Sequence, residues 1–308
     1  MHLIVPFAAA LAEGGRDAAR RLALPRLTAL LGRLAPVERD DGDEWSFSPP
    51  HERALARALG FAGGDGQLPW AAWRAQHDGL DTTDLAWGLL TPVHLHVGTD
   101  QVSLMDPAAL ALDDAGSRAL LDAVRELFTS EGFVVDYGAP QRWYVAHESL
   151  AGLRTASLDR VIGRNIDRWL TEASAVRLVR RLQNEVQMLL YTHPLNDARE
   201  AQGRLPVNSF WLSGCGVAQR PAGPPPTVDA RLREPALAED WAAWAKAWET
   251  LDEGPLAELA ARTARGEAVQ LTLCGERAST TLEPAHGAWT RLKVRATRPT
   301  PAAILETL

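Results

Sequence analysis

The chain has 308 residues, 46% hydrophobic and 23% charged, with a formal net charge of −7. This length suits two domains or one α/β core with an insertion, and the composition is that of a globular protein. Arginines and acidic residues are interspersed, so no basic stripe indicates nucleic-acid binding. No apolar stretch approaches the ~20 residues of a membrane-spanning helix. Two cysteines, Cys215 and Cys274, are too few for a disulfide framework, which favours a reduced, cytoplasmic location.

The first third of the chain predicts a buried strand followed by helices and loops. The first apolar run lacks a positively charged start and contains Pro6, which argues against a signal peptide and for a strand. In chain order we expect a strand at 3–5, a helix at 17–34 interrupted by Pro25, a loop at 38–50, a helix at 51–59 that stops at Gly60, and a short helix at 70–77.

The middle of the chain predicts a β-β-α-β-β unit followed by helices. Apolar runs of strand length alternate here with turn residues, and one long segment has an acidic first turn and apolar residues at helical spacing. We expect strands at 93–97 and 101–105, a helix at 113–131, strands at 133–137 and 142–146, one or two helices over 158–191, and a strand at 209–212.

The last third begins with a proline-rich linker at 219–235. In the helix that follows, Trp241, Trp244 and Trp248 share one face with Leu251, which predicts a buried stripe rather than a ligand platform. Strands are expected at 269–273 and 291–296.

Alternating strands and helices predict an α/β fold. The β-β-α-β-β unit lies between two segments that both have the pattern of a central sheet. We therefore expect an α/β core formed by 1–90 and 220–308, with a cap domain inserted at 91–219.

The segment 193–216 concentrates hydrogen-bonding side chains around an apolar strand. They are His193, Asn196, Arg199, Asn208 and Ser213, and the segment ends in Gly214-Cys215-Gly216. Such a set suits a small anionic ligand, because a glycine turn can present successive N–H groups and an arginine can form a bidentate pair. Arg142 is a further candidate for that pair. The alternative is architectural: Asn196 and Asn208 bond to nearby backbone, and Arg142 faces solvent.

The histidines and cysteines each allow a structural interpretation as well as a functional one. His94 and His96 are expected on one side of a strand and could bind a metal with His147, although surface or core histidines are more common. Cys215 could be a nucleophile, but no base is evident beside it, so we expect it to fill space in a tight turn. We expect Cys274 in the core.

The order His193-Pro194-Leu195-Asn196, Arg199, Gly203, Pro206, Asn208 and Gly214-x-Gly216 is similar to a stretch of the cofactor-independent phosphoglycerate mutases of the archaeal type. The similarity covers about two dozen residues, and weaker similarity to the same family extends to 244–259 and 271–280. It implies membership of the alkaline phosphatase superfamily, and therefore a reduced core sheet flanked by helices with an inserted α+β cap domain.

The sequence departs from that family where metal ligands are expected. The family's chemistry needs two divalent metals, such as manganese or zinc, and a serine or threonine nucleophile. Pro6-Phe7 stands where the resemblance places Asp-Gly, and Glu276-Arg277 stands where it places Asp-His. Glu276 could still bind a metal, whereas Arg277 is a permanent cation and cannot.

Three functions therefore remain open. In the first, two-metal catalysis and its metals are lost, and the protein binds a small phosphorylated or carboxylated metabolite through Arg142 and the segment 193–216. In the second, it is an active 2,3-bisphosphoglycerate-independent mutase whose metal ligands are relocated and include Glu276, His94 and His96. In the third, it is a structural or interaction protein in which the segment is only architectural.

Overall fold

The computed structural model describes residues 1–82, 84–169, 174–287 and 300–308. The chain forms two compact units, one from Met1–Glu44, Pro49–Gly60 and Pro221–Leu308 and the other from Trp45–Ser48 and Phe61–Arg220. Residues 61–90, predicted to belong to the core, pack in the second unit because the strand that they contain pairs with strands of that unit.

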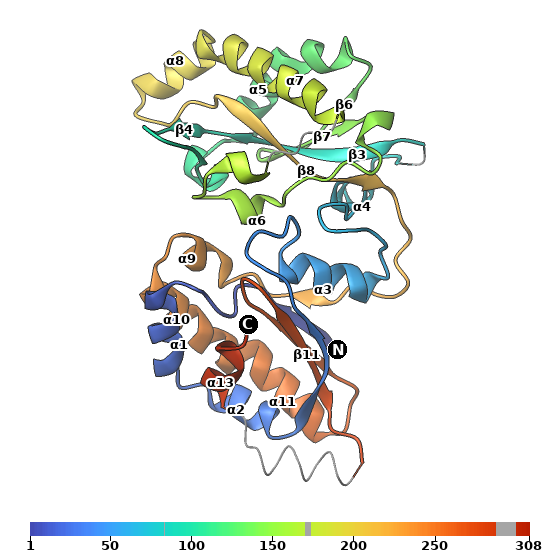
Figure 1. Ribbon diagram of the computed structural model, residues 1–308, viewed down its shortest axis with the longest axis vertical. Helices are drawn as coiled ribbons and strands as arrows, with labels where there is room; N and C mark the ends of the chain where they lie inside the picture. The colour runs from blue at the N-terminus through green and yellow to red at the C-terminus, as the bar shows by residue number, and fades with distance from the viewer. Residues whose placement is uncertain (83, 170–173, 288–299) are drawn as a thin grey trace. The chain divides into compact units, whose positions relative to one another are not determined.

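The first unit contains a five-stranded mixed sheet with the order β2-β11-β10-β1-β9 (Figure 1). Its strands are β1 (His2–Val5), β2 (Leu34–Asp40), β9 (Thr227–Val228), β10 (Gln270–Cys274) and β11 (Ser279–Pro284). β1 runs parallel to β9 and β10, whereas β11 runs antiparallel to β10 and β2. Leu3, Ile4 and Val5 are fully buried, which confirms the predicted first strand.

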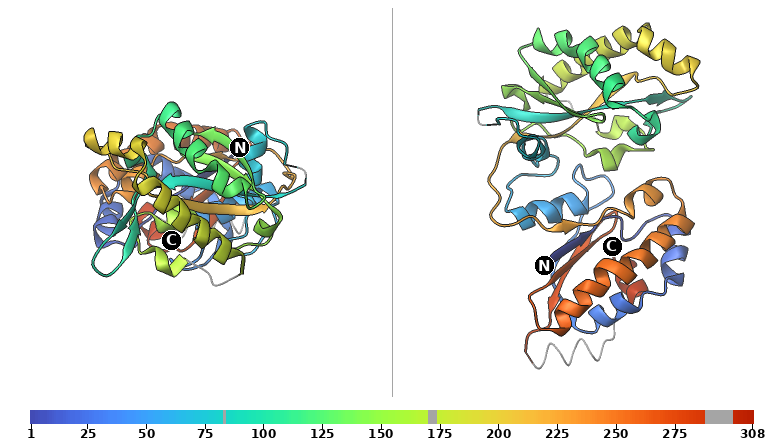
Figure 2. Two further views of the ribbon diagram at one scale, coloured as in Figure 1. Left: turned by 90° about the horizontal axis from the view of Figure 1, so that it is seen from above. Right: turned by 180° about the vertical axis from the view of Figure 1, so that it is seen from behind.

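Helices cover the two faces of this sheet unequally (Figures 1 and 2). One face carries α1 (Glu13–Arg21), α2 (Pro25–Leu31), α10 (Trp241–Leu251), α11 (Ala257–Ala264) and α13 (Pro301–Leu305), which share a core with leucines of the strands. The other face carries α3 (Pro50–Leu59), which packs on Ile4 and Cys274. The short helix α9 (Arg233–Leu237) precedes α10, and a π-helical turn at Asp252–Leu256 joins α10 to α11.

The tryptophan stripe of α10 forms part of that core, as predicted. Trp244, Trp248 and Leu251 are fully buried, and Trp241 is partly buried beside them. The Trp244 indole nitrogen donates a hydrogen bond to the Phe7 carbonyl at 2.9 Å.

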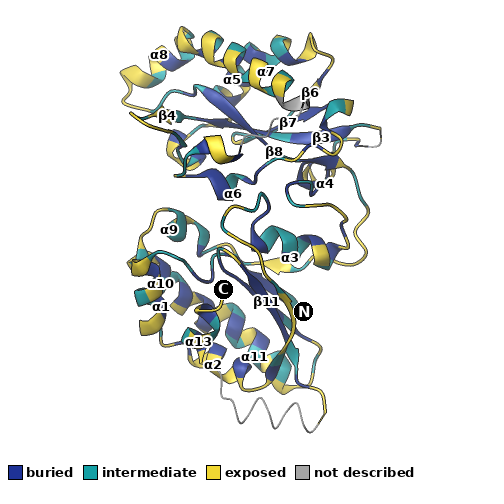
Figure 3. Ribbon diagram, viewed as in Figure 1, coloured by how far each residue is buried: buried dark blue, intermediate teal, exposed yellow. Residues whose placement is uncertain are grey.

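The second unit contains a four-stranded antiparallel sheet with the order β6-β7-β3-β8. The strands are β3 (Ala86–Val93), β6 (Val134–Ala139), β7 (Arg142–Ala146) and β8 (Ser209–Val217). α5 (Asp114–Thr129) and α7 (Ser174–Tyr191) pack on one face, and α4 (Trp70–His77) packs on the other. Figure 3 shows that β3, β7 and β8 are buried along most of their length, whereas the helices expose their outer sides. The edge strand β6 is mostly of intermediate exposure.

Smaller elements complete the second unit. They are β4 (Leu95–Val97), β5 (Val102–Leu104), α6 (Leu158–Val161), α8 (Pro194–Ala201) and 3-10 turns at Pro107–Leu110, Glu148–Leu150 and Ile166–Trp169. β4 and β5 pair as the predicted hairpin around Gly98-Thr99-Asp100, but they form a two-stranded sheet of their own. The predicted β-β-α-β-β order is confirmed as β4, β5, α5, β6 and β7, and of these strands only the last two join β3 and β8 in one sheet.

Several predicted boundaries are corrected. The helix expected at 17–34 is two helices separated before Pro25, because proline fixes its own backbone angle and favours a first helical turn. The loop expected at 38–50 is wrong at its start, where β2 continues to Asp40 by pairing with β11. The strand expected at 291–296 lies outside the described residues. Within the described chain, no helix has both the length and the apolar character needed to cross a membrane.

Candidate functional site

The Asn196 side chain in the segment 193–216 is fully engaged with backbone. The residue is 5% exposed, and its amide nitrogen donates to the Leu190 and Val207 carbonyls at 2.9 and 2.7 Å. Its amide oxygen accepts a hydrogen bond from the Val207 N–H at 2.9 Å. The side chain therefore joins the end of α7 to the residues that precede β8.

Asn208 and Arg199 make bonds of the same kind. The Asn208 amide pairs with both backbone groups of Leu95, accepting from its N–H at 2.8 Å and donating to its carbonyl at 2.9 Å. Arg199 donates from Nε to the Leu205 carbonyl at 2.9 Å and from Nη2 to the Leu110 carbonyl. Carbonyl oxygens thus accept from two of the three guanidinium nitrogens, Nε and Nη2, through which an arginine would hold an anion.

The remaining polar groups of the segment have local roles. His193 caps α8, because its Nδ1 accepts a hydrogen bond from the Leu195 N–H at 3.3 Å. Ser213 is 7% exposed within β8. Burial raises the pKa of the Cys215 thiol to about 12, so the thiol stays protonated at neutral pH. Cys215 and Cys274 are both buried, as predicted.

Gly214 and Gly216 allow α4 and the residue before it to approach β8 closely. Gly214 has φ of +63°, and a Cβ atom there would lie 2.9 Å from Trp70 Cβ. A Cβ atom on Gly216 would lie 2.9 Å from Pro69 Cβ. Such contacts are shorter than side chains tolerate, so the glycines serve packing against this helix.

Arg142 pairs with a carboxylate of the protein itself. Its Nε and Nη2 donate to Asp78 at 2.9 and 3.1 Å, and the Tyr144 hydroxyl donates to the same carboxylate at 2.6 Å. Burial acts to raise the pKa of Asp78, but the hydrogen bonds from Tyr144 and Arg142 outweigh burial and hold it below its usual value. Arg142 is thus placed on β7 and is not brought together with Asn196, Arg199 or Asn208.

The candidate metal ligands do not converge either. Glu276 accepts a hydrogen bond from the Leu11 N–H at 2.8 Å, and Arg277 beside it pairs with Glu44 at 2.7 Å. His94 lies between β3 and β4, so the prediction that it shares a strand with His96 is wrong. His147 caps a 3-10 turn through Ser149. In the described part of the chain, no three His, Cys, Asp or Glu side chains form a group that fits a metal ion.

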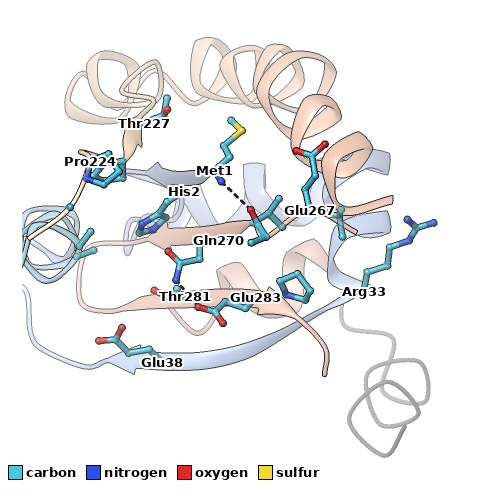
Figure 4. A pocket seen from close by; sticks show the side chains of 18 of the residues that line it. Met1, His2, Arg33, Glu38, Pro224, Thr227, Glu267, Gln270, Thr281 and Glu283 are labelled. Carbon is cyan, nitrogen blue, oxygen red and sulfur yellow. Dashed lines mark hydrogen bonds between the residues drawn. The ribbon is translucent and has the colours of Figure 1, made fainter. Parts of the chain in front are cut away.

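A cavity of about 1220 Å³ opens on the α3 side of the first unit's sheet (Figure 4). Four strands contribute polar side chains to it: His2 from β1, Gln270 from β10, Thr281 and Glu283 from β11, and Glu38 from β2. α3 and the prolines before β9 contribute part of the lining, and so do residues at the C-terminal ends of α2 and α11, which are helices of the opposite face. The chemistry-bearing side chains that share a cavity are therefore those of the sheet, not those of the segment 193–216.

Hydrogen bonds order the floor of this cavity. Gln270 Nε2 donates to Glu283 Oε1 at 2.6 Å. His2 Nε2 lies 2.8 Å from Thr272 Oγ1, which lies 2.9 Å from Thr281 Oγ1. Burial lowers the pKa of His2, the N-terminal ammonium adds to this, and Glu283 opposes it, so the imidazole is neutral at neutral pH. Gln270 Oε1 and Glu283 Oε2 have no hydrogen-bond partner among the described residues and remain as acceptors.

The charged side chains around this floor differ in how far they are neutralised. Arg57 pairs with Glu38 and with Asp40, both at 2.7 Å. Glu267 pairs with Arg262 and Arg265 at 3.2 and 2.6 Å. Arg33 also lines the cavity, is exposed, and forms no ion pair with any residue that the structure describes.

The sequence of β10 carries a signal for this floor. In β10, Gln270, Thr272 and Cys274 alternate with Leu271 and Leu273, which predicts a strand with one polar and one apolar face. Alternation alone does not reveal that the polar face lines a cavity, because that depends on which helices cover the sheet.

No protein-family model and no curated protein matches this chain. Among solved structures, it is similar to a cofactor-independent phosphoglycerate mutase from Thermoplasma acidophilum DSM 1728, with 13% identity and a TM-score of 0.37. That match covers 100% of this chain and 98% of the other. The chain is also similar to the PH0037 protein from Pyrococcus horikoshii, with 10% identity and a TM-score of 0.45, over 94% of this chain and 88% of the other.

Proposed function

We propose that the protein binds a small metabolite in the cavity of its first unit, and that this metabolite carries a phosphate or carboxylate group together with hydroxyl groups. The observation that supports the proposal is the polar floor formed by His2, Gln270, Thr281 and Glu283. The opposite face of the same sheet is apolar and covered by helices. Ligand-binding sites are typically preformed pockets in which a small number of precisely positioned polar groups orient the ligand.

The lining suggests how such a ligand lies. The Arg33 guanidinium forms no ion pair with the residues that the structure describes, and its planar donors suit a carboxylate or phosphate. Glu283 and Gln270 offer acceptors to hydroxyl groups, and the Thr281 hydroxyl adds a further partner. This keeps the ligand class predicted from the sequence but moves the site from the segment 193–216 to the sheet.

The role proposed is binding rather than chemical conversion. His2 is neutral and its hydroxyl neighbour is Thr272. Thr272 is fully buried and bonded to Thr281, so its oxygen is held inside the sheet and away from a ligand in the cavity. A metabolite-binding protein of this kind would act as a sensor or regulator.

The proposal is tested by thermal unfolding with 2-phosphoglycerate, 3-phosphoglycerate, glycerate, glycerol and inorganic phosphate. A ligand that binds only the native state stabilises it by about 2.7 kcal/mol at 100 times its Kd. We expect a hydroxylated acid to raise the unfolding midpoint by several degrees, and glycerol and phosphate to raise it less. Arg33→Ala and Glu283→Gln should each weaken the response about tenfold in ligand concentration.

The matched control is Arg21→Ala, which removes an exposed arginine from α1 on the covered side of the sheet. This variant should respond as the unmodified protein does. If none of the acids shifts the midpoint, or if Arg21→Ala loses the response as Arg33→Ala does, the cavity is not the proposed site.

A further inference from the structure

The carboxylate of Glu283 lies on the floor of the first unit's cavity (Figure 4). It accepts a hydrogen bond from Gln270 Nε2 at 2.6 Å and forms no ion pair with any residue that the structure describes. The residue is of intermediate exposure. A carboxylate that is partly withdrawn from water is stabilised by a nearby cation, so this position favours a positively charged group of a ligand.

The other two carboxylates of the lining differ from Glu283 in this respect. Glu38 pairs with Arg57 at 2.7 Å, and Glu267 pairs with two arginines at 3.2 and 2.6 Å. Within the described lining, Glu283 is therefore the carboxylate whose charge the protein leaves uncompensated.

The neighbouring groups of the cavity do not supply the missing charge. Burial lowers the pKa of His2, the largest effect on it, and although Glu283 opposes this, the imidazole is neutral at neutral pH. The N-terminal ammonium donates to the Ala268 carbonyl at 3.0 Å and pairs with no described carboxylate. Arg33 lines the same cavity and likewise forms no ion pair in the described part of the chain. The lining thus holds one side-chain cation and one side-chain anion that do not neutralise each other.

The floor around Glu283 offers acceptors without matching donors. Glu283 Oε2 and Gln270 Oε1 have no hydrogen-bond partner among the described residues, and the hydrogen bond between the two side chains holds them side by side. A hydroxyl group has one hydrogen to donate, whereas an ammonium group has three and carries the charge opposite to that of Glu283. An ammonium group can therefore serve both acceptors and neutralise the carboxylate, which a hydroxyl group cannot do.

We infer that the ligand of this cavity is a zwitterion, a small amino acid with or without a phosphate group, whose ammonium group faces Glu283 and Gln270 and whose anionic group faces Arg33. The inference rests on the binding proposed above and narrows its ligand class, since an ammonium group replaces one of the hydroxyl groups. A hydroxy acid fits the same positions without the charge pair, so it is the weaker ligand.

The test compares ligands that differ only at this group. Calorimetric titration of the full-length protein at constant ionic strength measures the dissociation constants of serine against glycerate and of O-phosphoserine against 3-phosphoglycerate. Each compound is used as the racemate, so that its handedness does not enter the comparison. Charge-assisted hydrogen bonds are about twice as strong as neutral ones, so we expect each amino compound to bind about tenfold more tightly than its hydroxy counterpart.

Three variants locate the preference. Glu283→Gln keeps the shape of the side chain and removes its charge, so the hydroxy acids should bind about tenfold more weakly and the amino compounds about a hundredfold more weakly, and the preference disappears. Glu267→Gln is the matched control, because it removes a lining carboxylate that arginines already neutralise, and it should keep the tenfold preference. Arg33→Ala should weaken both members of each pair by the same factor. The unfolding midpoint of each ligand-free variant shows whether it is folded.

The outcome separates this inference from the proposed function. If the hydroxy acids bind and the amino compounds bind no more tightly, the zwitterionic ligand is refuted and the binding proposed for the cavity stands. A folded Glu283→Gln variant that keeps the preference would also refute it. If the amino compounds alone bind, and Glu283→Gln abolishes this binding, the inference holds and the hydroxylated ligand class is corrected. If none of the four compounds binds, the inference and the proposed function are both wrong.

Discussion

At the scale of the residue, the sequence does not show which group a polar side chain forms its hydrogen bonds with. Asn196 has the hydrogen-bonding capacity of a ligand-binding residue, yet its oxygen and nitrogen both bond to backbone of the second unit. The same holds for Arg199 and Asn208. These bonds favour the architectural reading of the segment 193–216, in which side chains complete the backbone hydrogen bonds of a loop between two helices and a strand.

Replacing Asn196 by alanine tests that reading. The change leaves the buried Val207 N–H and the Val207 and Leu190 carbonyls without partners, so we expect the free energy of unfolding to fall by roughly 3 kcal/mol. Urea unfolding followed by circular dichroism measures it. Asn184→Ala, at an exposed position of α7, should change stability by less than ~0.5 kcal/mol. Equal stability of the two variants would refute the architectural role.

At the scale of the element, the close approach of α4 to β8 shapes the second unit. Gly214 sits at φ of +63° with Trp70 and Ala71 directly above its Cα. The Gly-x-Gly sequence was expected to form a turn that could hold a phosphate, but it lies inside β8, and a helix occupies the space in front of it. The packing of this helix on the strand thus decides the role of the glycines.

Gly214→Ala should therefore destabilise the protein. The new methyl group meets Trp70 Cβ at 2.9 Å, and alanine disfavours the positive φ, so we expect a loss of roughly 2–3 kcal/mol. Thermal unfolding measures it. Gly254→Ala is the control, because a Cβ atom there has no neighbour within 4 Å. If Gly214→Ala unfolds at the same midpoint as Gly254→Ala, the packing argument fails.

Elements defined by local signals were predicted well. The helices at 51–59 and 70–77 and the strand at 142–146 agree with α3, α4 and β7 to within one residue. Their boundaries depend on proline, glycine and apolar spacing within a few residues. β2 and β11 were missed because they are defined by pairing with each other and with β10, at a large distance in sequence.

At the scale of the whole molecule, the two units have separate cores, and the candidate site lies in the first unit. The first unit also carries an acid-sensitive ion pair, in which Asp40 on β2 accepts hydrogen bonds from Arg53 and Arg57 at 2.8 and 2.7 Å. Burial acts to raise the pKa of Asp40, but the hydrogen bonds from the two arginines outweigh it, and the folded-state pKa lies below the ordinary value.

The sign of the pH effect follows from that lowered pKa. The stabilisation is complete above the unfolded pKa, about 3.9, and is lost as the pH falls through the folded pKa. At pH 7, Asp40→Asn should lower the free energy of unfolding by ~1–3 kcal/mol, and this difference should shrink steadily as the pH falls below the unfolded pKa. Urea unfolding at pH 7 and at a series of lower pH values measures this. Asp122→Asn, at a more exposed ion pair, should change stability by at most ~1 kcal/mol, and a pH-independent loss in Asp40→Asn would contradict the mechanism.

The sequence by itself determined the α/β class, the buried first strand, the tryptophan core of α10 and the packing role of both cysteines. These four features follow from the composition and from the spacing of apolar residues over a few positions. Such local patterns are sufficient to predict whether a segment is a helix or a strand and which of its faces is buried. It also located the segment 193–216 as the densest set of hydrogen-bonding side chains, without determining what those side chains bond to.

Only the tertiary structure decided where the candidate site lies. Whether a polar side chain meets a ligand or a carbonyl depends on which backbone groups folding leaves unpaired nearby, and these come from distant parts of the chain. Near the loop before β8, the side chains of Asn196 and Asn208 from the predicted site form hydrogen bonds with backbone groups. The uneven covering of the first sheet left His2, Gln270 and Glu283 around a cavity instead.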